Sequence, residues 1–279
     1  MPSKRTTYTT DPIEINQILG ATHSDPFGFL GLHENPAGEG LVLRVFRPET
    51  SGVSVIPGAS EAVPMTSLDP AGFYEAVFPT ATERFGYELQ FQFKSGDTLT
   101  SVDPFSFGPV LGEQDLYFFG EGNHRHLYDC MGAHLTEIGG TSGVSFAVWA
   151  PNAHRVSVVG DFNVWDGRVH PMRNHNGTWE IFIPGISTGE HYKFEIVGAE
   201  GNLFVKSDPC AFFSQHGTQT ASITYDLDRY LWKDEAWMQK RAEADPYHSP
   251  MSIYEVHLGS WKRRFEEENR FLTYLELAD

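Results

Sequence analysis

The first 225 residues of this chain contain one sequence pattern twice. RVFRP (residues 44–48) returns as AVWAP (147–151), and VSV (53–55) returns at 156–158, both 103 residues later. GFYEAVFP (72–79) returns as GTWEIFIP (177–184), and Tyr87 and an Asp-Pro pair return as Tyr192 and a second Asp-Pro pair, now 105 residues later. A period of about 100 residues is the size of one small domain, too long for a solenoid repeat. We therefore predict two copies of one domain, over residues 20–125 and 139–225.

The pattern of apolar residues indicates what kind of domain is repeated. In residues 87–94 apolar and polar residues alternate strictly, and the same alternation returns at 192–196. Period-two alternation is typical of a strand with one buried and one solvated face. Short strands separated by turn signals every 8–12 residues or so are typical of a β-sandwich. The predicted fold class is mainly β, with two tandem immunoglobulin-like β-sandwich modules.

The residues outside the two repeats form a tail, a linker and a C-terminal segment. We expect an N-terminal tail over residues 1–19 and a linker over 126–138. Residues 226–279 are expected to form a connector followed by a strand at 253–257 and the start of an amphipathic helix near 270–279. A strand and a partial helix cannot bury their apolar sides alone, so the chain is expected to stop inside a larger domain.

Composition excludes several classes of protein. The formal net charge is −17, which argues against a general binder of nucleic acid phosphates. The longest apolar run is five residues, at 146–150, so no membrane span is expected. The N-terminus lacks the apolar segment of a signal peptide, and we expect a cytoplasmic protein.

An insert distinguishes the second copy and is the best candidate for a binding site. VSVVGDFNVWDG (156–167) stands where the first copy has VSVIPGAS, and it places Trp165 on a polar turn. An indole there can serve as a platform for the apolar face of a sugar ring, with Asn163 and Lys193 able to bond hydroxyl groups. The alternative is that Trp165 packs against its own sandwich or the next domain, and that Lys193 is simply solvated.

No pattern identifies a catalytic, metal or cofactor site. Glycine-rich phosphate loops, GxSxG and HExxH are absent, and no carboxylate pair suited to glycoside chemistry can be picked out. The linker region holds His124, His126 and His134 near Asp129 and Cys130, but their spacing fits no standard zinc pattern. We expect exposed histidines there, with a metal centre as the less favoured alternative.

Several long blocks nevertheless resemble a known family. FAVWAPNAHRVSVVGDFNVWDGRVHPMR, GTWEIFIPG, HYKFEI and KSDP are similar to the starch- and glycogen-binding sandwich of alpha-amylase superfamily enzymes. Together with HSDPFGFLGLH, DPFSFGPVLGEQDLYFFGEGNHRHLYDCMGAH and SPMSIYEVHLGSWKR, they resemble the N-terminal part of bacterial 1,4-alpha-glucan (glycogen) branching enzymes from about residue 23 onward.

The resemblance implies two sandwiches, then a (β/α)8 catalytic barrel, and a retaining transfer of an alpha-1,4-glucan segment to a 6-hydroxyl. A barrel needs about 250 residues, whereas residues 249–279 match only its first strand and the start of its first helix. No catalytic residue can therefore be assigned. Trp165 and Lys193 match glucan-site positions of the sandwich family. The family's second aromatic platform has no tryptophan here, where the sequence is GNLFVKSDP (201–209).

Three functional hypotheses follow. The first is the N-terminal piece of a branching enzyme, from a truncated gene, from a split reading frame with the barrel encoded separately, or as a partial sequence. The second is a stand-alone module pair that binds alpha-glucan, and the third is a non-functional remnant. In each case we expect the chain to be inactive alone.

Overall fold

The computed structural model describes residues 10–278, and the part of the predicted tail over residues 1–9 lies outside them. The chain divides into two compact units, one ending at Arg229 and the other beginning at Tyr230. Each unit is described by itself. The first unit contains both copies of the sequence repeat.

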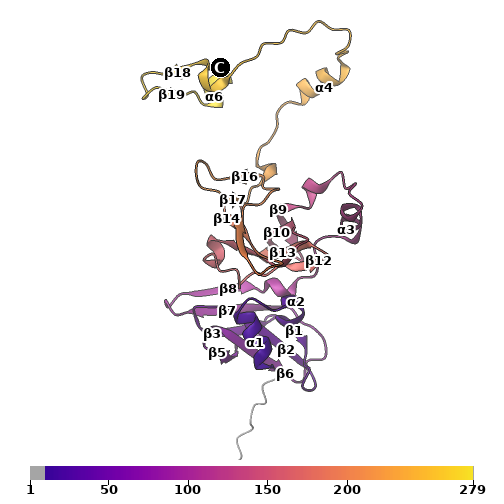
Figure 1. The fold of residues 1–279 in the computed structure, drawn as a ribbon, viewed down its shortest axis with the longest axis vertical. Helices are drawn as coiled ribbons and strands as arrows, with labels where there is room; N and C mark the ends of the chain where they lie inside the picture. The colour runs from indigo at the N-terminus through magenta and orange to yellow at the C-terminus, as the bar shows by residue number, and fades with distance from the viewer. Residues whose placement is uncertain (1–9, 279) are drawn as a thin grey trace, which may run out of the picture. The chain divides into compact units, whose positions relative to one another are not determined.

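The first copy of the repeat is a sandwich of two antiparallel sheets (Figure 1). One sheet has the order β1 (Gly31–Glu34), β2 (Leu41–Phe46), β6 (Phe73–Phe78), β5 (Thr66–Asp69). The other has the order β4 (Val63–Pro64), β3 (Thr50–Pro57), β7 (Tyr87–Phe93), β8 (Thr98–Val102). The alternating residues of β7 place Tyr87, Leu89 and Phe91 in the core between the sheets.

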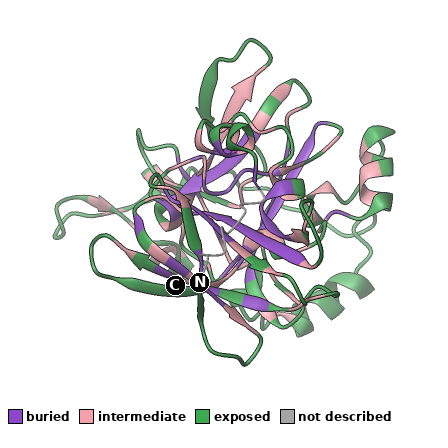
Figure 2. Ribbon diagram, turned by 90° about the horizontal axis from the view of Figure 1, so that it is seen from below, coloured by how far each residue is buried: buried purple, intermediate pink, exposed green. Residues whose placement is uncertain are grey.

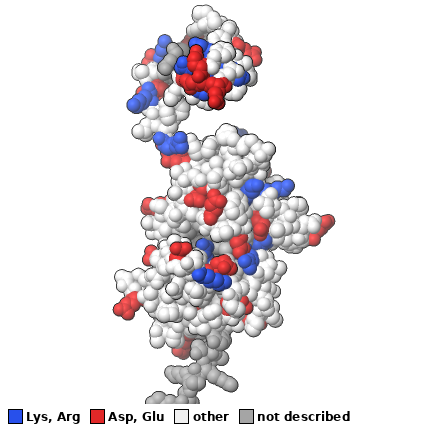
Figure 3. All heavy atoms as spheres, turned by 90° about the vertical axis from the view of Figure 1, so that its left-hand side faces the viewer, with Lys and Arg blue, Asp and Glu red and all other residues white. Residues whose placement is uncertain are grey.

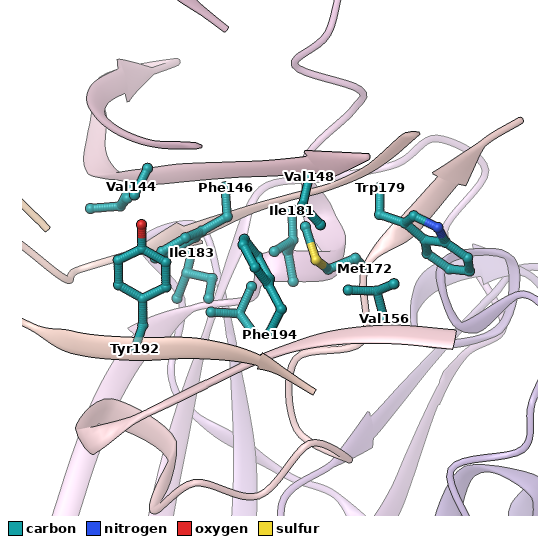
Figure 4. Packing of buried hydrophobic residues seen from close by; sticks show 12 residues of the cluster. Val144, Phe146, Val148, Val156, Met172, Trp179, Ile181, Ile183, Tyr192 and Phe194 are labelled. Carbon is teal, nitrogen blue, oxygen red and sulfur yellow. The ribbon is translucent and has the colours of Figure 1, made fainter. Parts of the chain in front are cut away.

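The second copy repeats this arrangement with an extended second sheet. Its first sheet has the order β12 (Arg173–His175), β13 (Thr178–Pro184), β10 (Thr141–Trp149), β9 (Gly132–Ile138). Its second sheet has the order β11 (Ala153–Gly160), β14 (His191–Gly198), β17 (Ser222–Ile223), β16 (Phe213–Ser214), and β15 (Leu203–Lys206) pairs with β14. In Figure 4, Tyr192 and Phe194 of β14 point toward the residues of the facing strands, as expected for the core of a sandwich.

The prediction of two tandem β-sandwiches is confirmed, and the sequence matches have a common structural cause. Tyr87 Oη donates a hydrogen bond to Asp103 Oδ2 over 2.6 Å, and Tyr192 Oη donates to Asp208 Oδ2 over the same distance. All four side chains are buried. Each repeat therefore keeps the same internal polar pair.

Helices lie outside the two sandwiches. Helix α1 (Pro12–Leu19) falls within the segment that we described as a tail, and its Ile15 and Ile18 are buried against the first sandwich. Helices α2 (Pro26–Phe29) and α3 (Glu113–Gly120) precede the first and second sandwich respectively. The buried residues are concentrated on the strands (Figure 2).

A buried carboxylate links the chain segment between the repeats to the second sandwich. Glu180 of β13 is 1% exposed. Its Oε2 accepts hydrogen bonds from the backbone amides of Val110 (2.9 Å) and Leu111 (2.7 Å). Arg173 of β12 donates to the carbonyl oxygen of Phe107 over 3.0 Å. These bonds fix the segment that connects the two sandwiches.

The second unit has little packing of its own. It contains α4 (Glu235–Glu243), α5 (Leu258–Trp261), β18 (Arg263–Arg264), β19 (Arg270–Phe271) and α6 (Tyr274–Ala278). Residues 253–257, where we expected a first barrel strand, form no strand. A barrel strand is held by hydrogen bonds to parallel neighbours, and residues 230–278 provide no such neighbour. The expected helix is present as the short α6.

Candidate functional site

The insert of the second repeat forms a tight turn held by Asn163. The turn begins with the 3₁₀ segment Asp161–Asn163 directly after β11. Asn163 Oδ1 accepts from the backbone amide of Gly160 (2.9 Å), and Nδ2 donates to the carbonyl oxygen of Val158 (2.8 Å) and to His170 Nδ1 (2.9 Å). Asn163 is 3% exposed. Its amide therefore supports the turn and is not available to a ligand.

His170, which follows the insert in the sequence, also supports the turn through its bond to Asn163. Burial, with a smaller contribution from the charge of Arg47, lowers the pKa of His170 to about 3. The imidazole is neutral at physiological pH, so Nδ1 can accept the hydrogen bond from Asn163 while Nε2 carries the proton. A buried, neutral pair thus fixes both ends of the turn.

The tip of the turn has a strained backbone. Val164 and Trp165 have φ values of 56° and 59°, in the left-handed region that disfavours residues with a Cβ atom, and β-branched ones most of all. Val164 is 86% exposed, so its side chain contributes little packing in return. Strain of this kind, held by a rigid surrounding, is concentrated at functional sites in proteins.

The strained turn presents the indole of Trp165 to solvent. Trp165 Nε1 donates to Asp161 Oδ1 over 2.9 Å, and Asp161 Oδ2 lies 3.0 Å from His191 Nδ1. These contacts fix the edge of the indole ring. The side chain as a whole remains 39% exposed. A fixed, partly open aromatic ring is suited to stacking against an apolar ligand face.

Trp165 and Lys193 line the same hollow, as the sequence suggested, whereas Asn163 does not. The hollow has a volume of about 370 Å³ and lies at one end of the second sheet, where it is also lined by residues of the loop before β17. Lys193 Nζ donates to Thr220 Oγ1 over 2.8 Å. The hollow therefore combines one aromatic ring with several hydrogen-bonding groups. We call it the Trp165 hollow.

The sequence predicts two of the nine residues that line this hollow, and three of the others make hydrogen bonds to them or to each other. His191 lies two residues before Lys193 on the same face of β14, so the period-two pattern could have identified it. Asp161 directly follows β11 in the same turn as Trp165, and the structure makes it the partner of the indole N–H. Thr220 belongs to a distant loop, and no local signal connects it to Trp165.

The stretch 201–209 contributes no aromatic side chain to the Trp165 hollow. Its Phe204 lies on the edge strand β15, opposite Ile196 of β14, with Lys206 Nζ 5.7 Å from the ring centroid. Phe204 is exposed but is not among the residues that line the hollow.

The histidines near the linker include one cluster with metal-binding side chains. Asp115, His124 and Cys130 bring ligand atoms within 4.8 Å of one another. The backbone amide of His126 donates to His124 Nδ1 over 3.1 Å, which places the ring proton on Nε2, where it bonds Asp115 Oδ1 at 2.9 Å. Burial, and then the nearby carboxylates, raise the pKa of Cys130 to about 11, which keeps the thiol protonated. Asp115 and His124 thus form a hydrogen-bonded pair, and the three side chains are also close enough to hold a metal ion.

Surface charge bears on the binding of nucleic acid, and helix length bears on the spanning of a membrane. On the face shown in Figure 3, basic groups lie among acidic ones and form no continuous band. No helix within residues 10–278 is long and apolar enough to cross a membrane.

Two parts of this β-sandwich pair match known domain families. Residues 130–211 match carbohydrate-binding module 48, also described as the isoamylase N-terminal domain. Residues 11–105 match the N-terminal domain of the alpha-1,4-glucan branching enzyme GlgB. The resemblance to the N-terminal part of bacterial 1,4-alpha-glucan branching enzymes is thereby confirmed.

Curated relatives agree with these domain matches. The chain is 46% identical to the 1,4-alpha-glucan branching enzyme GlgB of Myxococcus xanthus, over 95% of this chain and 36% of the relative. The GlgB of Rubrobacter xylanophilus shows the same identity and coverage, and that of Thermosynechococcus vestitus is 42% identical over 97% of this chain and 38% of the relative. The chain thus spans little more than a third of the length of these relatives.

A solved structure gives a weaker match. The maltotriose complex of a PulA mutant from Klebsiella pneumoniae is 17% identical to this chain, with 70% of this chain and 24% of that chain covered. The TM-score is 0.33.

Proposed function

We propose that the second sandwich binds alpha-glucan chains at the Trp165 hollow. The observation that carries this proposal is the indole of Trp165, held open by a strained turn beside Lys193 and His191. A glucose ring has an apolar C–H face that can stack on the indole, while its hydroxyls can bond the lysine, histidine and amide groups around it. The module match over residues 130–211 supports the same class of ligand.

The chain as a whole then acts as the glucan-binding front part of a branching enzyme, and alone it carries out no transfer. Retaining glycoside chemistry needs two carboxyl groups about 5 Å apart, one acting as nucleophile and the other as acid and base. The Trp165 hollow is lined by a single carboxylate, Asp161, whose two oxygens contact Trp165 and His191. This supports a role in holding glucan rather than cleaving it.

We also propose that the protein resides in the cytoplasm. Cys130 and Cys210 are both unpaired, as is usual in a reducing compartment.

Replacing Trp165 by alanine tests the binding site. We expect Trp165→Ala to weaken the binding of soluble glycogen or maltoheptaose by about 1.5–3 kcal/mol, the scale for burying a large apolar side chain. Affinity electrophoresis in glycogen gels measures this. Trp237→Ala, which removes an exposed tryptophan of the second unit, is the matched control and should bind as the unaltered chain does. Equal binding by both variants would move the site elsewhere.

An activity assay tests the second part of the proposal. Amylose incubated with the purified chain should keep its iodine spectrum, whereas a full-length branching enzyme assayed in parallel should lower the absorbance. A shift produced by the 279-residue chain alone would refute the proposed lack of transfer activity.

A further inference from the structure

A second exposed tryptophan lies on the opposite sheet of the second sandwich. Residues of β10 alternate, so that Val144, Phe146 and Val148 face the core and Trp149 faces outward. Trp149 is 56% exposed. Together with the neighbouring ring of Phe119, this open indole forms a contiguous apolar surface of the kind that marks binding sites.

Strand register places polar residues next to this indole. Trp149 pairs with Thr178 of β13, and Thr178 pairs in turn with His175 of β12, so the three residues form a row on one face of three adjacent strands. Thr178 lies between two larger side chains. Phe119 of α3 closes one side, with its ring centroid 5.9 Å from that of Trp149 and its plane at 73° to it.

These residues line a hollow of about 810 Å³, which we call the Trp149 hollow. Its other described lining residues come from α3, from the turn after it, from β12 and from the turn after β12, namely Leu116, Gly120, Gly122, Asn174 and Asn176. The volume is larger than that of the Trp165 hollow, and it lies within the range of small-molecule sites in proteins.

The chemistry of the lining indicates the class of ligand. None of the described residues that line the Trp149 hollow is a Lys, Arg, Asp or Glu. The side chain of Asn176 makes no hydrogen bond within residues 10–278, and Asn174 uses only its Oδ1, which accepts from the amide of Gly177 over 2.8 Å. A flat aromatic ring beside unused neutral amides fits a ligand with an apolar face and hydroxyl groups but no charge.

We propose that the Trp149 hollow is a second binding site for alpha-glucan, separate from the Trp165 hollow. A glucosyl ring stacks on the indole of Trp149, and its hydroxyls bond the amide of Asn176. This proposal rests on the proposed function, because it takes its ligand from the same polymer. The two hollows share no lining residue, so they can be tested separately.

The test follows the indole N–H signals of the six tryptophans in ¹H–¹⁵N spectra as maltoheptaose is added to the full chain. The signals are assigned with single Trp→Phe variants. We expect the signals of Trp149 and Trp165 to shift, each with its own dissociation constant. Trp179 is the internal control, because its Nε1 is bonded to the carbonyl oxygen of Ala150 beneath the sheet and should not shift.

Variants separate the two sites. In Trp165→Ala, the Trp149 signal should still shift with an unchanged dissociation constant. Asn176→Gly removes one amide and keeps a backbone φ of 52° that glycine tolerates, and it should weaken binding at Trp149 about fivefold, the scale of one hydrogen bond. Phe118 lies on α3 beside Phe119 but does not line the Trp149 hollow, so Phe118→Ala should have no effect on binding.

The outcomes distinguish the two proposals. A Trp149 signal that stays fixed while the Trp165 signal saturates would overturn the second site and leave the first intact. A shift at Trp149 alone would uphold the second site and refute the proposed function at Trp165. If neither signal moves, both proposals fail.

Discussion

At the scale of single residues, the turn after β11 divides its tasks between neighbouring side chains. Trp165 is open to solvent, while Asn163, two residues earlier, is enclosed and bonded at both ends of its amide. The left-handed residues Val164 and Trp165 cost about 1–2 kcal/mol each. The bonds of Asn163 offset this strain and keep the indole in position.

Replacing Asn163 by alanine should therefore destabilise the fold as well as the site. The change leaves the amide of Gly160, the carbonyl of Val158 and His170 Nδ1 without their partner in a buried place. We expect a loss of about 3 kcal/mol in the free energy of unfolding, since each unsatisfied buried group costs about 1–3 kcal/mol. Urea titration followed by fluorescence measures it.

A matched control for this variant is Asn123→Ala, an exposed asparagine whose side chain makes no hydrogen bond within the described chain. It should change the free energy of unfolding by less than about 0.5 kcal/mol. Similar values for the two variants would contradict the supporting role assigned to Asn163.

Local sequence patterns led to Trp165 and Lys193, which the structure places at one hollow. A tryptophan on a polar turn and a lysine on the outer face of an alternating strand are visible in short windows. Asn163 was assigned to the ligand because an asparagine in a turn can either face outward or bond its own backbone. Only the position of His170 in three dimensions decides between these alternatives.

At the scale of elements, each repeat uses one glycine to bring two strands close together. Gly72 has a φ of 111°, and a Cβ atom there would lie 2.2 Å from the carbonyl oxygen of Arg47. Gly177, its counterpart, has a φ of 96°, and a Cβ atom would lie 2.7 Å from Cα of Pro151. The matched GFYE and GTWE segments are thus constrained by backbone geometry as well as by burial.

Two glycines with the same φ separate these two constraints. Gly189 also has a φ of 96°, but a Cβ atom there would meet nothing within 4 Å. We expect Gly189→Ala to cost about 1–2 kcal/mol in the free energy of unfolding, the penalty of the left-handed backbone alone. Gly177→Ala should cost at least about 1 kcal/mol more, because overpacking is added to that penalty. Equal costs in urea titrations would show that the close approach to Pro151 is unimportant.

The buried Asp103, which accepts the hydrogen bond from Tyr87, should make stability depend on pH. Burial raises the pKa of Asp103 from 3.8 to about 6, although hydrogen bonds from Tyr87 and Phe105 oppose the increase. Between these values the folded chain retains a proton that the unfolded chain has released, so stability falls as the pH rises through this window. The loss is about 3 kcal/mol and is complete above the folded pKa.

Asp103→Asn removes this titration, since an amide can still accept from the backbone of Phe105 and can donate to Tyr87. The unaltered chain loses stability between pH 4 and pH 7, and the variant should not. We therefore expect the difference in the free energy of unfolding, variant minus unaltered chain, to increase over this range. Denaturant titrations across this range measure the difference. A difference that does not vary with pH would rule out a raised pKa at Asp103.

At the scale of the whole molecule, the repeat in the sequence was sufficient to predict the two sandwiches. Five ordered matches define two copies, and alternation defines their class. The joint between the sandwiches could not be predicted in this way. It depends on Glu180 meeting the backbone amides of Val110 and Leu111, about 70 residues away, and backbone donors leave no mark in a sequence.

The two units of the chain should differ sharply in resistance to protease. No described residue of the second unit is buried, whereas the first unit holds two sandwich cores. Segments with little burial open at low free energy and are cut first. Dilute trypsin should therefore cut first at or after Arg229, with Lys233, Lys240 and Arg241 as early sites, and leave a resistant fragment that holds both sandwiches.

Mass spectrometry of a digestion time course identifies these cuts. Arg173 is the internal control, because it is bonded to Phe107 and Glu180 and should be cut late. A chain ending at Arg229 should keep the thermal midpoint of the full chain, because the removed residues bury no side chain of their own. Early cuts within the strands would contradict this, and so would a lower midpoint for the shorter chain. A lower midpoint would mean that the second unit contributes to the stability of the sandwiches, whereas early cuts within the strands would mean that the sandwiches open at lower free energy than their burial indicates.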